Sequence, residues 1–233
     1  MTVTNLQLTL ELGSGIALGH PWLNGDGVLE RLALIDHAGR EYDRWVADLE
    51  EDGPADLRDV DAVETGLEYT NGLAHASVSQ FDTDRTVETT LYSSYDEVRA
   101  HTVEGSRSRS KIPIGGGRFK SQMIDVVYRP ARQCTFYFRG DRDRIEYLLD
   151  THLTDLGKKT AAGFGKVTDW GLRELDTDYS LVHPTEGVAM RPLPTSALDN
   201  WNDQQTLTWK TPYWYTEWAT ECAPPGTEVE PAW

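Results

Sequence analysis

Residues 133–175 restrict the fold of this chain more than any other segment. Apolar and polar residues alternate over 134–138, the period-two pattern of a strand with one buried face. Asp141 follows as a candidate N-cap, and apolar residues then recur at helical spacing over 145–156. Residues 166–175 return as a strand. A strand, helix, loop and strand in this order predict a small sheet with helices on one face.

The preceding chain supplies matching elements. Four leucines alternate with polar residues over 6–12, which predicts another half-buried strand. Apolar residues from Val28 to Ile35 predict a helix that begins near Asp26, a candidate N-cap, and stops at Gly39. Asn71-Gly72 between two alternating runs predicts a β-hairpin. Further strands are expected at residues 86–95, 124–128, 179–182 and 187–191.

The charge is unevenly distributed. The 233 residues carry a net charge of −16, which on its own argues against a nucleic-acid ligand because phosphates attract cations. Residues 105–173, however, hold 14 of the 22 basic residues and only 7 of the 38 acidic ones, a net charge of +7, and the rest of the chain has −23. This basic block within an acidic protein is compatible with a polyphosphate ligand.

Other features narrow the class of protein. There is no apolar run of membrane-spanning length, and the chain has only two cysteines. We also expect no signal peptide, because the first residues lack a basic and an apolar region. These features favour a reduced, cytoplasmic protein, and no Cys/His cluster has the spacing of metal ligands. We therefore expect no membrane association, no metal and no cofactor.

A glycine-rich loop is the first candidate site. Residues 157–165 read Gly-Lys-Lys-Thr-Ala-Ala-Gly-Phe-Gly, and Lys166 follows. Gly157 is a candidate helix C-cap, and the three glycines permit positive φ angles. Unpaired amides in such a loop can hold a phosphate, and the lysines add charge. Phe164 would stack on a base or anchor the loop in the core. The alternative is a plain connection between a helix and a strand.

A basic segment is the second candidate. Residues 105–120 are rich in glycine and poor in apolar residues, so we expect a mobile loop or an extended hairpin. Its cations are Arg107, Arg109, Lys111, Arg118 and Lys120. The alternative is a solvated linker without a ligand.

Three segments carry a resemblance to a known family. The Leu-Gly, basic and Gly-Phe-Gly pattern at 156–166 resembles the glycine-rich loop of the RAMP superfamily of CRISPR proteins. His20-Pro-Trp-Leu-Asn-Gly-Asp-Gly-Val-Leu29 and Gly187-Val-Ala-Met-Arg-Pro-Leu-Pro194 resemble the Cas-five-like, 5′-handle-binding subunit of type IV CRISPR effector complexes. The three segments lie in the same order and at similar separations as in that branch.

The resemblance implies an α/β (α+β) fold of the ferredoxin-like or RNA-recognition type with a β-rich C-terminal extension. It implies a core at residues 1–176 with a thumb loop near 105–122, an extension at 177–222 packed on the core, and a disordered tail at 223–233. It also implies RNA contacts in two places. In the glycine loop these are Gly157, Lys158, Lys159, Gly163, Phe164, Gly165 and Lys166, and in the thumb they are Arg107, Arg109, Lys111, Arg118 and Lys120.

By the same resemblance, the expected function is non-catalytic. The chain would hold the 5′ repeat-derived handle of a CRISPR RNA and cap a multi-subunit effector complex for antiviral defence. Its partners would be CRISPR RNA, a backbone filament, a large subunit and, indirectly, the target nucleic acid.

Two alternatives stay open. Some RAMP proteins are metal-independent endoribonucleases that use a histidine, and His20 and His37 are the candidates here. The chain could instead be an acidic protein-interaction module that binds no RNA. The tryptophans and tyrosines at 201–218 favour core packing or a subunit contact over base stacking.

Overall fold

The computed structural model describes residues 2–39, 63–93, 122–213 and 215–233. Its main sheet contains four strands in the order β5-β8-β1-β9, and each neighbouring pair is antiparallel. These strands are β1 (Val3–Leu12), β5 (Gln80–Phe81), β8 (Gln133–Asp141) and β9 (Val167–Leu175).

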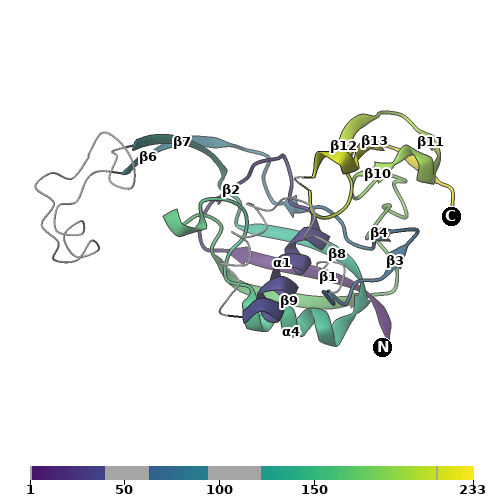
Figure 1. Cartoon of the computed structure of the whole chain (residues 1–233), viewed down its shortest axis with the longest axis horizontal. Helices are drawn as coiled ribbons and strands as arrows, with labels where there is room; N and C mark the ends of the chain where they lie inside the picture. The colour runs from purple at the N-terminus through teal and green to yellow at the C-terminus, as the bar shows by residue number, and fades with distance from the viewer. Residues whose placement is uncertain (1, 40–62, 94–121, 214) are drawn as a thin grey trace, which may run out of the picture.

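Two helices complete this unit. Helix α1 (Gly25–Ala38) lies between β1 and β5 in the sequence, and α4 (Arg142–His152) lies between β8 and β9. The order β-α-β-β-α-β with this antiparallel sheet is the ferredoxin-like arrangement. The predicted α+β, ferredoxin-like fold is thus confirmed, and Figure 1 shows the sheet with its helices.

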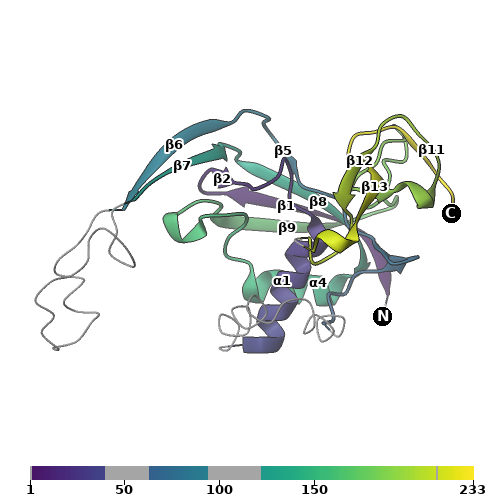
Figure 2. The same ribbon diagram turned by 45° about the horizontal axis from the view of Figure 1, so that its top comes forward.

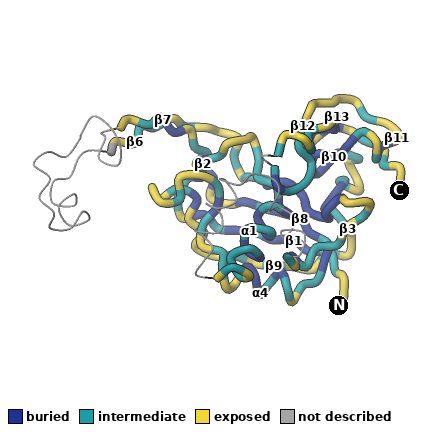
Figure 3. Tube along the Cα trace, in the orientation of Figure 1, coloured by how far each residue is buried: buried dark blue, intermediate teal, exposed yellow. Residues whose placement is uncertain are grey.

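The core lies between the sheet and its two helices, which cover one face (Figure 2). Leu8 of β1 is paired with Phe136 of β8, and both side chains are fully buried. Leu29 of α1 and Leu148 of α4 are also fully buried in this cluster. Burial of each such side chain contributes about 1.5–3 kcal/mol to the stability of the fold. Figure 3 shows that the buried positions gather in the sheet and the helices that cover it.

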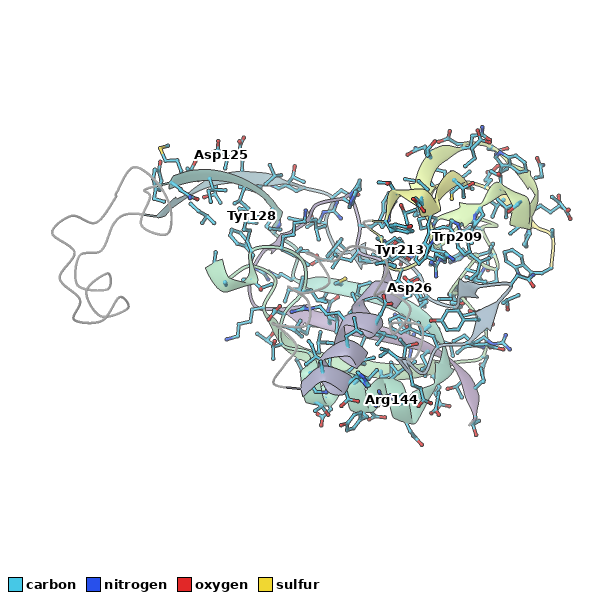
Figure 4. The ribbon with its side chains drawn as sticks, in the orientation of Figure 1. Asp26, Asp125, Tyr128, Arg144, Trp209 and Tyr213 are labelled. Carbon is cyan, nitrogen blue, oxygen red and sulfur yellow. The ribbon has the colours of Figure 1, made fainter. Side chains whose placement is uncertain are left out.

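Asp36 links the two helices. Its carboxylate accepts hydrogen bonds from Arg144 (2.9 Å) and Tyr147 (3.0 Å) and lies 3.1 Å from the His152 ring nitrogen. Burial tends to raise the pKa of Asp36, but the bonds from these three side chains outweigh it and hold the pKa below its usual value. The contact fixes α4 beside α1 (Figure 4).

The helix boundaries differ from those predicted in two places. The N-cap of α1 is Asn24, not Asp26, which lies inside the first turn and is buried. Helix α4 ends at His152, so Gly157 is not a helix C-cap. The chain at 154–156 instead pairs with residues 165–167, through Leu156 N–H to the Gly165 carbonyl (2.8 Å). The other predicted caps, Gly39 and Asp141, are confirmed.

A β-hairpin arm projects from this body (Figure 1). It consists of β6 (Val87–Ser93) and β7 (Gln122–Arg129), and its base pairs with β2 (Ile16–Ala17). The two predicted strands are thus confirmed. The basic residues expected between them, Arg107, Arg109, Lys111, Arg118 and Lys120, lie outside the described residues.

The C-terminal part is β-rich, as predicted. It contains β10 (Leu193–Pro194), β11 (Leu198–Trp201), β12 (Gln205–Thr208), β13 (Ala219–Ala223) and β14 (Val229–Pro231). A second hydrophobic cluster holds Leu181, Leu193 and Leu198 together with Leu73. The 3-10 turns are at Thr160–Ala162, Thr195–Ala197 and Thr216–Trp218.

Three other expectations have definite outcomes. The Asn71-Gly72 hairpin is confirmed between β3 (Tyr69–Thr70) and β4 (Leu73–Ala74). The strands expected at 179–182 and 187–191 are reduced to isolated bridges, between Val182 and Ala189 and between Val188 and Glu228. The prediction of a disordered tail at 223–233 is wrong, because β14 pairs with β11 and Thr227 is buried. We expected disorder because this segment contains several prolines, but backbone pairing with β11 orders it.

Candidate nucleic-acid interface

The glycine-rich loop connects the end of the 154–156 segment to β9. Gly165 has a φ of +69°, and a Cβ at this position would overlap the carbonyl oxygen of Leu156. Gly163 has a φ of +91° with open space around it. Glycine is needed at 165 for both conformation and close approach, whereas at 163 it is needed for conformation alone.

The loop uses many of its own amides. Lys158 N–H donates to the Ala17 carbonyl (2.7 Å), and Gly165 N–H donates to the Gly15 carbonyl (2.8 Å). Lys166 N–H donates to Ser14 Oγ (3.0 Å), and further amides bond within the loop. The expectation that unpaired glycine amides hold a phosphate is therefore weakened, and the lysine side chains are the better candidates.

Phe164 anchors the loop to the arm. Its ring lies 5.3 Å from the ring of Tyr128 on β7, tilted by 54°. Gly15 accommodates the same tyrosine, because a Cβ there would overlap the Tyr128 ring. The expected contact with the core is replaced by this contact with the arm, and stacking on a base stays a prediction. The loop is thus held both by the base of the arm, at Tyr128 (Figure 4), and by residues 14–17.

The three lysines of the loop are exposed. Lys158, Lys159 and Lys166 have no ion-pair partner within the described part of the chain. The side chain of Lys158 lies against Gly19, which has no side chain to displace it. Three unneutralised amines within nine residues are a local positive site in a protein of net charge −16.

Two cavities lie near the start of α1, and one of them borders the glycine-rich loop. The first, of about 300 Å³, lies between the loop and the start of α1, with Trp22, Leu32 and Lys158 in its walls. The second, of about 630 Å³, lies between α1, residues 63–72 and residues 210–218. Its carboxylates (Asp26, Glu30, Glu64, Glu68 and Asp141) outnumber its one cation, Lys210. The lining of the second cavity is therefore mainly acidic, whereas Lys158 and Arg31 border the first.

A buried ion pair joins two of the segments that carried the family resemblance. Arg191 donates to Asp26 at 3.0 Å, and Tyr213 donates to the same carboxylate at 2.7 Å. Arg191 also donates to the carbonyls of Ala74, Ala76 and Trp209. Burial raises the pKa of Tyr213 well above its usual value, against the opposing effect of Arg191, so the hydroxyl keeps the proton that it donates.

Sequence reasoning missed this network. It treated Asp26 as a cap and gave Arg191 and Tyr213 no partner, because the contacts span 165 and 187 residues of sequence. The available signal was a carboxylate in the first turn of the helix, directly before its buried apolar stripe. Figure 4 shows Asp26, Tyr213 and Trp209 close together at the junction with the C-terminal part.

The two candidate catalytic histidines do not form one site. His20 is exposed, precedes α1 and lines the smaller cavity. His37 is exposed in the last turn of α1, which places it about 18 Å from the start of the helix at 1.5 Å per residue. His75, which sequence reasoning did not select, is buried within 3.1 Å of Asp178 and 2.8 Å of Thr70.

The aromatic residues at 201–218 divide between packing roles. Trp201 and Trp209 pack against the second hydrophobic cluster. Trp218 contacts the ring of Tyr215 and lies 4.2 Å from the amine of Lys210. Core packing is thus shown for the first two residues.

Comparison with known proteins adds to this geometry. The family model described as CRISPR type IV associated protein Csf3 matches residues 73–223, which is more than half of the chain. The chain belongs to this family. The resemblance drawn from the sequence segments is thereby confirmed at the level of the type IV CRISPR branch.

The remaining comparisons are weaker. None of the curated proteins compared matches the Csf3-family chain. A chain of the "Cryo-EM structure of the Type III-B Cmr-beta bound to cognate target RNA" is similar at 8% identity with a TM-score of 0.37. The similarity covers 74% of this chain and about three-fifths (61%) of that one. The assignment of the fold rests on the strand order described above.

Two further findings concern the described residues alone. None of their helices is long and apolar enough to cross a membrane. They also contain no group of three or more His, Cys, Asp or Glu residues placed to hold a metal ion.

Proposed function

We propose that this Csf3-family chain is a non-catalytic, RNA-binding subunit of a CRISPR effector complex. It would hold the 5′ repeat-derived handle of the CRISPR RNA and cap the assembly in the cytoplasm. Membership of a type IV CRISPR family supports the role in a complex. The observation that carries RNA binding is the set of three exposed, unneutralised lysines on a loop anchored to the projecting arm.

The electrostatics favour side chains over backbone in this role. The loop amides are largely used in holding the loop on residues 14–17, so phosphates would meet the amines of Lys158, Lys159 and Lys166. Each amine is a flexible point charge that follows a strand backbone without reading its sequence. We extend the proposal to the five cations of the 107–120 segment, whose positive charge would add to the attraction for phosphate.

The partners follow from this role. A subunit that holds one end of the RNA would contact a backbone filament and a large subunit, and would meet the target nucleic acid through the guide. The projecting β6–β7 arm offers a surface of its own, where Tyr92 and Met123 are paired and are 73% and 70% exposed. We propose this pair as part of a contact with a neighbouring subunit.

Charge reversal tests the proposal. Lys158→Glu, Lys159→Glu and Lys166→Glu together should abolish retention of CRISPR RNA in the assembled complex, measured as RNA co-purified per complex. The matched control carries arginine at the same three positions and should retain the RNA, because the charge is kept. Undiminished retention by the glutamate variant would remove the loop from the RNA path.

A second measurement separates the nuclease alternative. The pure protein is incubated with repeat RNA in EDTA, and we expect the RNA to stay intact. Cleavage that His20→Ala or His37→Ala abolishes would instead support a metal-independent endoribonuclease. If no RNA co-purifies with the wild-type complex, the acidic interaction module is the better interpretation.

A further inference from the structure

We infer that the smaller cavity, between the glycine-rich loop and the start of α1, receives a single nucleobase splayed out of the bound RNA strand. The inference rests on the proposed function and adds a base-binding site to it. Its walls are mainly apolar and aromatic: Trp22, Leu23, Val28, Leu32, Leu156 and Tyr213. The volume of about 300 Å³ is at the lower end of the range for small-molecule sites.

The cavity is built by three separate segments. Residues 19–24 form one side, the first two turns of α1 form the second, and residues 155–158 form the third. Tyr213 closes one end, where its ring packs 3.4 Å from the position of a Cβ on Gly27. Its hydroxyl is fixed by Asp26 and Arg191, so this wall is rigid before any ligand arrives.

The rim is cationic, whereas the walls are apolar. Lys158 belongs both to the cavity and to the loop proposed to hold phosphate. Arg31 is also at the rim. It pairs with Asp155 at 3.4 Å, so this carboxylate does not neutralise Lys158. This arrangement suits a nucleotide, whose phosphate stays at the rim while its base enters an apolar site. The larger, acidic cavity lacks this combination.

Asn24 supplies a second, independent observation. It is the N-cap residue of α1, yet its side chain makes no capping hydrogen bond. Its Oδ1 atom is shielded from solvent and has no hydrogen-bond partner among the described residues. Asn24 lines the cavity, and a rotation of its side chain would turn the amide toward a ligand. An amide pairs with the donors and acceptors on the edge of a base, which gives the site a means of selecting one base.

The test combines a protein change with an RNA change. Complexes are assembled with synthetic handle RNAs that carry one abasic nucleotide at each position in turn. We expect one position at which the wild-type complex loses roughly 5- to 100-fold in RNA affinity, the range for stacking of one base. Trp22→Leu should cause a similar loss with intact RNA and no further loss with that abasic RNA.

Matched variants define the control. Trp170→Leu changes the same side chain on β9, outside the cavity lining, and should leave the position-specific penalty unchanged. Trp22→Phe keeps an aromatic ring and should keep the penalty as well. Asn24→Ala leaves the apolar walls intact and should relax the preference for one base at that position. This variant keeps the inference testable if Trp22→Leu fails to fold.

The outcomes separate this inference from the proposed function. If the wild-type complex binds handle RNA but Trp22→Leu and Asn24→Ala weaken no single position, the base site is wrong and RNA binding stands. If Trp22→Leu blocks assembly with the other subunits in the absence of RNA, the cavity is a protein contact and the inference fails. If the wild type binds no handle RNA, the proposed function fails first.

Discussion

Arg191 has the largest fully buried side chain among the described residues. Its guanidinium joins α1, the β4 segment and residues 209–213 through Asp26, backbone carbonyls and Tyr213. A buried charge is tolerated only when it is paired and hydrogen-bonded. This one residue therefore holds the C-terminal part against the ferredoxin-like unit.

Replacing Arg191 leaves the Asp26 carboxylate buried without its partner. We expect Arg191→Met to lower the free energy of unfolding by about 3–5 kcal/mol, measured by urea denaturation of the purified chain. Adding Asp26→Asn to Arg191→Met should cost less than the two single changes summed, because the unpaired charge is removed. Arg142→Met, which breaks exposed pairs with Glu146 and Glu174, is the control and should leave the free energy of unfolding nearly unchanged. Equal costs for the two arginines would contradict the role given to Arg191.

The sequence could name these residues but not their contacts. Asp26 and Arg191 both fall in segments that carried the family resemblance, and Lys158, Lys159 and Lys166 were selected from composition and spacing. Local patterns report on neighbours three or four residues away, whereas the pair of Asp26 with Arg191 is set by tertiary packing. The same limit hid Tyr128 as the partner of Phe164.

At the scale of elements, the glycine-rich loop is a closed structure held on the β1–β2 corner. Its shape depends on positive φ angles at Gly157, Gly163 and Gly165. The environments of Gly163 and Gly165 differ, since only the second is in close contact with the backbone of Leu156. The two positions therefore separate backbone conformation from steric approach.

This difference gives a matched pair of substitutions. Gly163→Ala should cost about 1 kcal/mol of stability from the conformational preference alone. Gly165→Ala must also move the Leu156 carbonyl, so it should cost clearly more and release the loop from Gly15. Urea unfolding measures the cost, and hydrogen exchange at the amides of Lys158 and Gly165 reports the release of the loop. Equal effects of the two substitutions would contradict the close approach at Gly165.

Long periodic elements were predictable, and junctions were not. The alternation in β1 and β8, the helices and the arm strands follow from one buried face and its period. The end of α4 was placed four residues too late, because Leu153 and Leu156 continue the helical spacing while lying in extended chain. The order of the tail was missed because β14 is stabilised by pairing with β11, which local propensity does not report.

For the whole molecule, the contrast between an acidic body and a small basic site governs how salt acts on RNA binding. A lysine that neutralises a phosphate releases a counterion, so affinity falls as salt rises, with a slope of about −0.7 per contact for a single strand. The body, with its net charge of −23 outside residues 105–173, repels RNA, and salt screens that repulsion. The two effects oppose each other, so the total slope should be shallower than the number of contacts alone implies.

The loop contribution can be isolated by difference. Replacing Lys158, Lys159 and Lys166 with glutamine removes three amines but leaves the acidic body unchanged. The slope of log affinity against log salt should then become less negative by about 2 units, measured by anisotropy of labelled handle RNA on assembled complexes. Arginine at the same positions should restore the wild-type slope. An unchanged slope with lower affinity at every salt concentration would show that the lysines act through the fold of the loop and that the phosphates lie elsewhere.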